Sequence, residues 1–202
     1  MKYTIDFCFK GKRTYIQGPD IFDAVVEKIK ENYDFKKILN IKYAAHEMLH
    51  TNATLTFVQD KDFDKSNYKV INSVITFNIN KNKIFGIVSS NNELIECSNK
   101  YSEDIVRNNS LIENNIISFK NTTEDSYTEL IVSMNKYFLQ TTIPLEGKWI
   151  VSQLKYNNII DIIDINDKIL KIEMKHNFNN KLVKSSIHIN ESCVGELFFS
   201  LI

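Results

Sequence analysis

The chain contains the same order of predicted elements twice. Each half of the 202-residue sequence opens with a short strand-like run, continues into an amphipathic helix and ends in four strand-like runs. When position i is compared with position i+110, a few residues coincide: Phe9-Lys10 with Phe119-Lys120, Ile21 with Ile131, Ile79-Asn80 with Ile189-Asn190, and Ser90 with Ser200. These identities are few, so the shared element order is the stronger evidence. The duplication predicts one repeat at 1–90, a polar connector at 91–114 and a second repeat at 115–202.

Both predicted helices carry apolar residues at helical spacing. The stripes are Phe22, Val25, Val26, Ile29 and Tyr33 in the first half, and Leu130, Ile131, Met134, Tyr137 and Phe138 in the second. The segment Gly18-Pro19-Asp20 marks the first start, because proline is tolerated in a first helical turn. Ser126 followed by Glu129 is a capping-box pattern at the second start, and Pro144 and Gly147 lie beyond its end.

The remaining elements are predicted to be strands. The opening runs lie at 3–9 and 115–119, and the later runs lie at 37–49, 51–60, 69–79 and 83–90, then at 148–163, 168–176, 181–189 and 193–202. Apolar and polar residues alternate clearly from Ile169 to Met174, as expected of a half-buried strand. Only two prolines and five glycines interrupt the chain, which favours long strands. The connector allows a short helix from Ser102.

This element order resembles the hotdog fold, in which an antiparallel sheet wraps around one long helix. Two copies in one chain resemble the double-hotdog proteins of the thioesterase and acyl dehydratase superfamily. The resemblance implies an α+β fold made of two fused hotdog-like repeats. A rival α+β arrangement is two separate small sheets, each covered by one helix.

Composition excludes several classes of partner. The 25 basic and 25 acidic residues cancel, so no net charge attracts the chain to nucleic acid. No stretch approaches the length of apolar sequence that a membrane-spanning helix needs, and the N-terminus does not read as a signal peptide. Cys8, Cys97 and Cys193 are an odd number at wide spacing. We therefore predict unpaired thiols and a cytoplasmic location.

The segment AAHEMLH at 44–50 contains the pattern H-E-x-x-H, formed by His46, Glu47 and His50. On a helix, this spacing places two imidazoles on one face for zinc, with a carboxylate beside them to activate water. The flanking residues are strand-like, however, and the matching part of the second half is rich in isoleucine. We therefore predict that 44–50 is extended, with Glu47 on the face opposite the two histidines. No third ligand is evident, so no metal is expected, and a zinc hydrolase stays an alternative.

Hotdog proteins commonly act on acyl thioesters of coenzyme A or acyl carrier protein, as in fatty acid or polyketide metabolism. The resemblance therefore implies a dehydratase or a thioesterase without a cofactor. Backbone N–H groups at a helix N-terminus can polarise a thioester carbonyl, and a histidine or carboxylate can then move a proton. Dehydratases of this class usually carry a histidine in the loop before the helix, and neither loop here has one.

The polar residues of the first half are the candidates for such a site. The predicted catalytic residues are His46, as general acid or base, then Glu47, His50 and Asp20; the predicted substrate-binding residues are Arg13, Tyr15, Gln17 and Gly18. Asp20 or the amides after Gly18 would position the carbonyl or a water molecule. His176 and His188 are predicted to be exposed surface residues. The alternative is a non-catalytic acyl-binding or interaction module. A homodimer is compatible with the enzyme and with the binding module.

Overall fold

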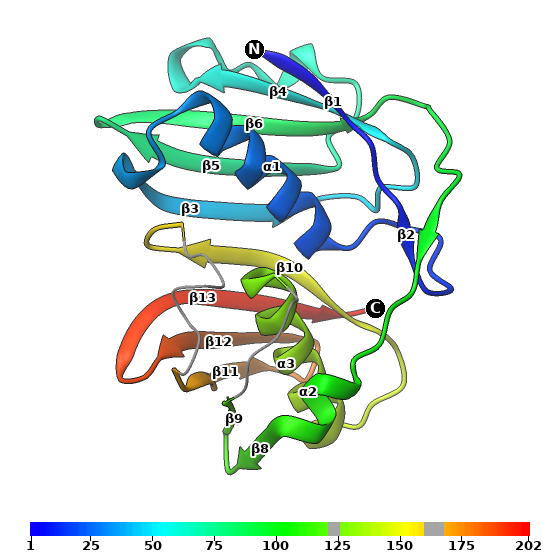
Figure 1. The fold of residues 1–202 in the computed structure, drawn as a ribbon, viewed down its shortest axis with the longest axis vertical. Coiled ribbons are helices and arrows are strands. Elements are labelled where there is room, and N and C mark those ends of the chain that lie inside the picture. The colour runs from blue at the N-terminus through cyan, green and yellow to red at the C-terminus, as the bar shows by residue number, and fades with distance from the viewer. Residues whose placement is uncertain (121–125, 160–167) are drawn as a thin grey trace. The chain divides into compact units, whose positions relative to one another are not determined.

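The computed structural model describes residues 1–120, 126–159 and 168–202. The chain divides into two compact units, Met1–Tyr101 and Ser102–Ile202. Each unit combines one long helix with an antiparallel sheet, as Figure 1 shows for α1 and α3. The strand run predicted at 148–163 ends in residues that lie outside the described part of the chain.

The first unit is built on one antiparallel sheet with the strand order β1-β4-β6-β5-β3. Its strands are β1 (Lys2–Ile5), β3 (Ile38–Ala45), β4 (Ala53–Gln59), β5 (Ser73–Ile79) and β6 (Asn82–Ser90). A separate parallel pair joins β2 (Phe9–Lys10) to β7 (Ser98–Asn99). Short 3₁₀ turns lie at Phe35–Lys37, Asp60–Asp62 and Lys65–Asn67.

Helix α1 (Gly18–Asn32) confirms the helix predicted from the apolar stripe. Val25 and Ile29 are completely buried, and Phe22 packs edge-on against Tyr43 of β3 with ring centroids 6.4 Å apart. The helix starts at the expected place, with Pro19 in its first turn. Burial of this stripe against the sheet forms the core of the first unit and fixes where the N-terminus of α1 lies.

The second unit has an antiparallel sheet with the strand order β10-β13-β12-β11-β9-β8. Its strands are β8 (Ser110–Glu113), β9 (Ile116–Phe119), β10 (Trp149–Tyr156), β11 (Leu170–Phe178), β12 (Leu182–Ile189) and β13 (Ser192–Leu201). The short helix expected from Ser102 is α2 (Asp104–Asn109). Strand β8 lies in the segment predicted to be connector, where no strand was expected.

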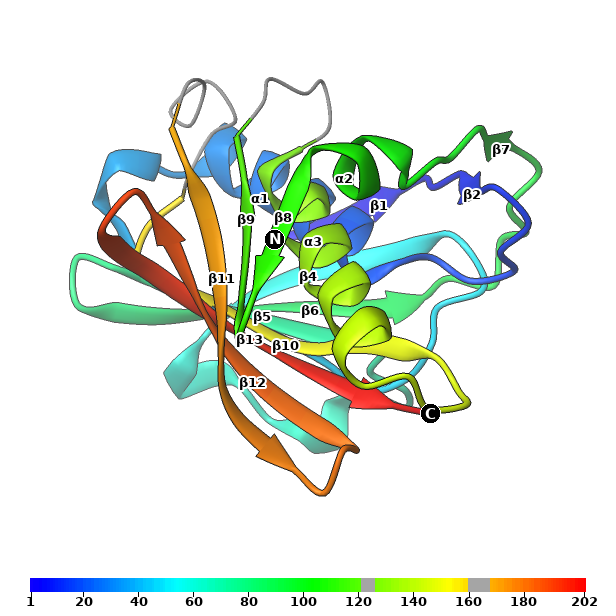
Figure 2. The same cartoon turned by 90° about the horizontal axis from the view of Figure 1, so that it is seen from below.

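Helix α3 (Tyr127–Thr142) lies along one face of this sheet (Figure 2). The predicted cap is present, because the Ser126 hydroxyl accepts a hydrogen bond from the Glu129 N–H at 2.9 Å. Ile131, Met134 and Phe138 of the predicted apolar stripe are completely buried and Leu130 is almost so, while Tyr137 is half-buried. This capped helix and its buried face organise the core of the second unit.

The two units share an element order but not a strand order. At the offset of 110, β5 corresponds to β12 and β6 to β13. In the first unit β5 pairs with β3, whereas in the second unit β13 pairs with β10. The reason lies in the connections. In the first unit, residues 60–72 connect β4 to β5, and these two strands are separated by β6 in the sheet. In the second unit, a tight turn with positive φ at Asn179 and Asn180 connects β11 directly to its neighbour β12.

The prediction of three unpaired thiols was wrong for two of them. Cys8 and Cys97 form a disulfide, with a Cα–Cα distance of 4.8 Å. The two cysteines are 89 positions apart in the sequence, and the pairing of β2 with β7 brings them together. The sequence alone does not reveal this pairing. Cys193 is free, as expected, and it is exposed.

None of the helices in the described ranges combines the length and the apolar character needed to cross a membrane.

Candidate active site

The segment that contains His46, Glu47 and His50 is not helical. Strand β3 ends at Ala45, and the following residues form a loop up to the start of β4. We predicted that 44–50 is extended, and the structure confirms a strand only for Ala44 and Ala45. The zinc-hydrolase alternative needs a helix across the motif, and the loop does not provide one. Within the described ranges, no group of three or more His, Cys, Asp or Glu side chains is arranged to hold a metal ion.

A buried asparagine fixes the conformation of this loop. The Asn72 carbonyl accepts hydrogen bonds from the N–H groups of His46 and Glu47, at 2.9 and 3.1 Å. The Asn72 side-chain amide donates to the Met48 carbonyl at 3.1 Å, and its oxygen accepts from the Ser90 N–H at 2.8 Å. The Asn72 side chain and backbone thus hold the loop on the sheet, while the side chains of His46 and Glu47 remain exposed. Sequence reasoning missed Asn72, because it lies in a strand-like run with no pattern around it.

His50 is the candidate whose ring orientation is defined. Leu49 is completely buried, and its carbonyl accepts a hydrogen bond from the Ile16 N–H at 2.8 Å. This bridge places His50 beside the loop that precedes α1, where His50 Nδ1 lies 2.6 Å from the Thr14 carbonyl oxygen. A carbonyl can only accept, so Nδ1 carries the proton. In the neutral ring Nε2 then holds the lone pair, and the exposed side chain can act as a base.

The N-terminus of α1 lies immediately after this loop. Its N-cap residue, Gln17, makes no side-chain capping hydrogen bond, and Gly18 opens the helix. Tyr15, Gln17 and Gly18 are half-buried. Gly18 and Asp20 contribute N–H groups to this first turn, whereas Pro19 has none and the Ile21 N–H donates to the Gln17 carbonyl at 3.2 Å. N–H groups at a helix N-terminus can donate to a bound oxygen atom, favoured by the helix dipole. The bridge between Ile16 and Leu49 therefore brings His50 to the segment that leads directly into these amides.

The other charged candidates are held by neighbours. Asp20 Oδ1 lies 2.7 Å from Lys10 Nζ, and each side chain is only 19% exposed. The Arg13 guanidinium lies over the Tyr101 ring, 4.2 Å from its centroid, and Arg13 Nη1 donates to the Lys10 carbonyl at 3.4 Å. Asp20 is thus better suited to anchoring the loop than to transferring a proton. Across the described ranges, no hydrogen bond or ion pair joins the side chain of His46 or Glu47 to the other candidates.

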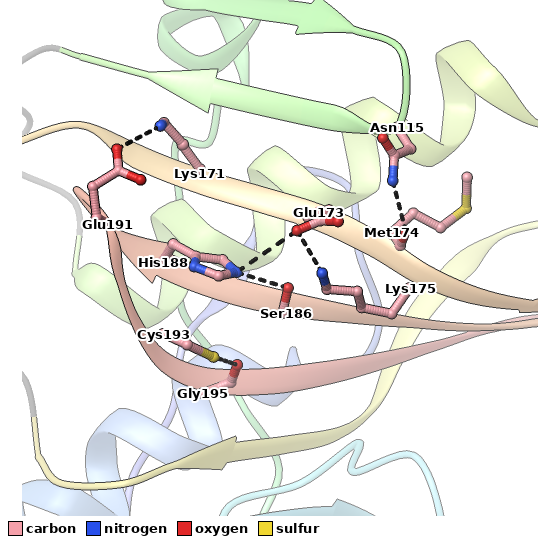
Figure 3. A network of polar contacts seen from close by, with 10 residues as sticks. All are labelled: Asn115, Lys171, Glu173, Met174, Lys175, Ser186, His188, Glu191, Cys193 and Gly195. Carbon is pink, nitrogen blue, oxygen red and sulfur yellow. Dashed lines mark hydrogen bonds and ion pairs between the residues drawn. The ribbon is translucent and has the colours of Figure 1, made fainter.

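A second polar cluster lies on the sheet of the second unit (Figure 3). His188 Nε2 is 2.9 Å from Ser186 Oγ and 3.9 Å from Glu173 Oε2, and Glu173 Oε2 contacts Lys175 Nζ at 2.6 Å. The expectation of an exposed His188 was wrong, because its side chain is 22% exposed and hydrogen-bonded. His176 is exposed as expected. Glu173 of β11 lies directly opposite Ser186 of β12. The alternation of polar and apolar residues in these two runs is the sequence signal from which this pair could have been predicted.

The geometry of this cluster does not match a serine–histidine–acid triad. Such a triad needs the serine and the carboxylate on opposite ring nitrogens. Here Ser186 and Glu173 both face Nε2 of His188. The cluster is therefore best described as polar pairing between neighbouring strands.

Comparison with known proteins supports the fold. No protein family model matches the sequence, and neither does any curated protein. The structure is similar to the tesB protein of Mycobacterium avium subspecies paratuberculosis, with a TM-score of 0.55 and 5% identity, covering 100% of this chain and 93% of that one. A Thermobifida fusca protein assigned as a thioesterase II gives a TM-score of 0.54 at 6% identity, with 100% and 92% covered.

A dehydratase is also similar. The dehydratase domain of PpsC from Mycobacterium tuberculosis, solved in complex with C12:1-CoA, gives a TM-score of 0.50 at 7% identity, covering 100% of this chain and 92% of that one. Together these likenesses confirm the predicted hotdog-like α+β fold. At such low identity they define the fold, and the chemistry has to be argued from the residues.

Proposed function

We propose that this protein binds acyl thioesters of coenzyme A or acyl carrier protein and hydrolyses them, with His50 as the general base. The observation that carries the proposal is the hydrogen bond between His50 Nδ1 and the Thr14 carbonyl, which leaves Nε2 as the basic nitrogen beside the approach to α1. The fold supports the substrate class, since similar folds occur in thioesterases and in a dehydratase domain bound to an acyl-CoA.

The proposed reaction uses few groups. The thioester carbonyl accepts hydrogen bonds from the first-turn amides of α1, which stabilise the negative charge of the tetrahedral intermediate. His50 Nε2 takes a proton from a water molecule as its oxygen bonds to the carbonyl carbon. The intermediate collapses with cleavage of the C–S bond, and the proton passes to the departing thiolate. The products are a carboxylic acid and the free thiol of the carrier.

Hydrolysis is favoured over dehydration by the state of Asp20. A dehydratase needs an acid that protonates the leaving hydroxyl as well as a base that removes the α-proton. The ion pair of Asp20 with Lys10 leaves its carboxylate engaged, whereas hydrolysis needs only one base. The roles of His46 and Glu47 as alternative proton-transfer groups remain predictions, since both side chains are exposed on the same loop.

A binding module without catalysis is the second candidate. It is favoured by the engagement of two predicted site residues, Asp20 with Lys10 and Arg13 with Tyr101, in contacts within the unit. Such a protein would retain acyl-thioester affinity and lack turnover.

The test is thioester hydrolysis by the purified protein, followed by thiol release, on acyl-CoAs from acetyl to palmitoyl and on acyl carrier protein loaded with the same chains. We expect His50→Ala to lower kcat by about 10²–10⁴-fold, with a smaller change in KM. His176→Ala, at an exposed histidine on β11, is the matched control and should match the wild type. Unchanged turnover in His50→Ala would remove His50 from the mechanism, and binding without turnover of any substrate would select the binding module.

A further inference from the structure

The disulfide lies at the base of a small exposed ribbon. Strands β2 and β7 pair over only two residues each. Their backbone hydrogen bonds run from the Phe9 N–H to the Cys97 carbonyl at 3.0 Å and from the Gly11 N–H to the Asn99 carbonyl at 2.9 Å. Paired strands this short are marginal in water without further support. The bond between Cys8 and Cys97 is therefore the main restraint that joins the two segments.

The disulfide is accessible to a reductant. Cys97 is exposed and Cys8 is half-buried, and both strands of the ribbon are partly or fully exposed. Exposed disulfides exchange more readily with external thiols than buried structural ones do. A thiolate can therefore reach the Cys97 sulfur without prior unfolding of the core.

The ribbon supports the first part of the candidate-site loop. Gly11, with φ +61°, turns the chain out of β2, and its carbonyl accepts a hydrogen bond from the Ser98 hydroxyl at 3.0 Å. Arg13 then lies over the ring of Tyr101, two residues after β7. The later part of the loop has its own anchor in the bridge between Ile16 and Leu49. Release of the ribbon should thus loosen the contact between Arg13 and Tyr101, while the Lys10–Asp20 ion pair and the Ile16–Leu49 bridge keep the start of α1 in place.

We propose that the Cys8–Cys97 disulfide is a redox-controlled clamp on the loop that carries Arg13. A dithiol reductant attacks the exposed Cys97 sulfur, the bond between the two cysteines breaks, and Cys8 leaves as a thiolate. The second thiol of the reductant then displaces Cys97 and closes its own disulfide. Two electrons pass from the dithiol to the protein, and two protons complete the Cys8 and Cys97 thiols. The consequence for substrate affinity rests on the proposed function, whereas the opening of the ribbon does not.

The opening is tested by amide hydrogen exchange of the full chain with Cys193→Ser, which excludes exchange with the third thiol. Oxidised protein is compared with protein reduced by dithiothreitol, and thiol titration verifies two new thiols per chain. We expect exchange at Phe9 and Gly11 to accelerate about tenfold or more on reduction, while Ile16 and the α1 amides stay unchanged. The variant Cys8→Ser/Cys97→Ser/Cys193→Ser should resemble the reduced form under oxidising conditions.

Equal exchange at Phe9 and Gly11 in both redox states would overturn the clamp, as would recovery of three free thiols from the wild-type protein purified without reductant. Affinity for an acyl-CoA, measured on the same samples, should fall severalfold on reduction. If no sample binds any acyl thioester, the proposed function fails, and the exchange data still decide whether the clamp exists. If binding is equal in both states while exchange differs, the clamp does not control the site.

Discussion

Asn72 shows how a single residue can determine the shape of the candidate site. It is 4% exposed, and its side chain makes one hydrogen bond to the loop after β3 and one to the end of β6. A buried polar group of this kind is costly to remove because each former partner is left unsatisfied. The candidate histidines therefore depend on a residue that has no chemical role itself.

We expect Asn72→Ala to lower the free energy of unfolding by about 2–4 kcal/mol, because it leaves the Met48 carbonyl and the Ser90 N–H without their partner. Urea denaturation measures the change. Asn78→Ala is the control, because Asn78 lies half-buried in β5, the strand that follows Asn72, and its side chain has no hydrogen bond within the described ranges. A loss in Asn72→Ala no larger than in this control would contradict the assigned role.

The contribution of Glu196 to stability depends on pH. Its carboxylate lies 2.6 Å from Lys184 Nζ and 3.3 Å from Lys155 Nζ, and hydrogen bonding to Lys184 is the main reason that its pKa is lowered from 4.5. A lowered carboxyl pKa stabilises the fold above the ordinary pKa, and this contribution is lost as the pH falls through the lowered value. The group is 35% exposed, so the contribution is at most about 1 kcal/mol.

Glu196→Gln should therefore reduce stability at pH 7 by up to about 1 kcal/mol and by less at pH 3. Thermal or urea unfolding at both values measures this difference. Glu191→Gln is the matched control, since Glu191 also faces a lysine, Lys171, but is 91% exposed (Figure 3). A Glu196→Gln loss that is the same at both pH values would show that the ion pairs do not cause it.

At the scale of elements, the two long helices begin in different ways. Helix α3 has a side-chain cap at Ser126, whereas the N-cap of α1, Gln17, has none. Both starts were predictable because the signals are local: a capping box in one case and a proline in the first turn in the other. The Gln17 side chain makes no capping bond at the start of α1, whereas the Ser126 side chain occupies the start of α3, and this difference supports the placement of the proposed site at α1 rather than at α3.

This difference predicts responses of unequal size to alanine at the two N-caps. Ser126→Ala should destabilise the protein by about 1 kcal/mol, because the Glu129 N–H loses its acceptor. Gln17→Ala should change stability by a few tenths of a kcal/mol at most, since no capping bond is lost. Equilibrium denaturation of both variants measures the pair, and an equal loss in both would refute the contrast.

The strand pairing of the whole molecule was much harder to predict than its elements. The periodicity of residues 51–60 and 181–189 is a local property and gave strands in the right places. The crossing made by residues 60–72 depends on which strands meet in three dimensions, and no local pattern encodes it. The same limit explains the missed disulfide and the incorrect reading of His188. Of the candidate site, the residue types were predictable, while the orientation of His50 required the position of Thr14.

The central claim is that the loop before α1 and the loop after β3 form one acyl-thioester site. The most direct measurement is calorimetric titration of the oxidised protein with a thioether analogue of an acyl-CoA, which can bind but cannot be hydrolysed. We expect saturable one-to-one binding to the wild type and to His50→Ala, with turnover of the true thioester lowered by about 10²–10⁴-fold in His50→Ala. Absence of binding by the wild type across short and long acyl chains would contradict the account.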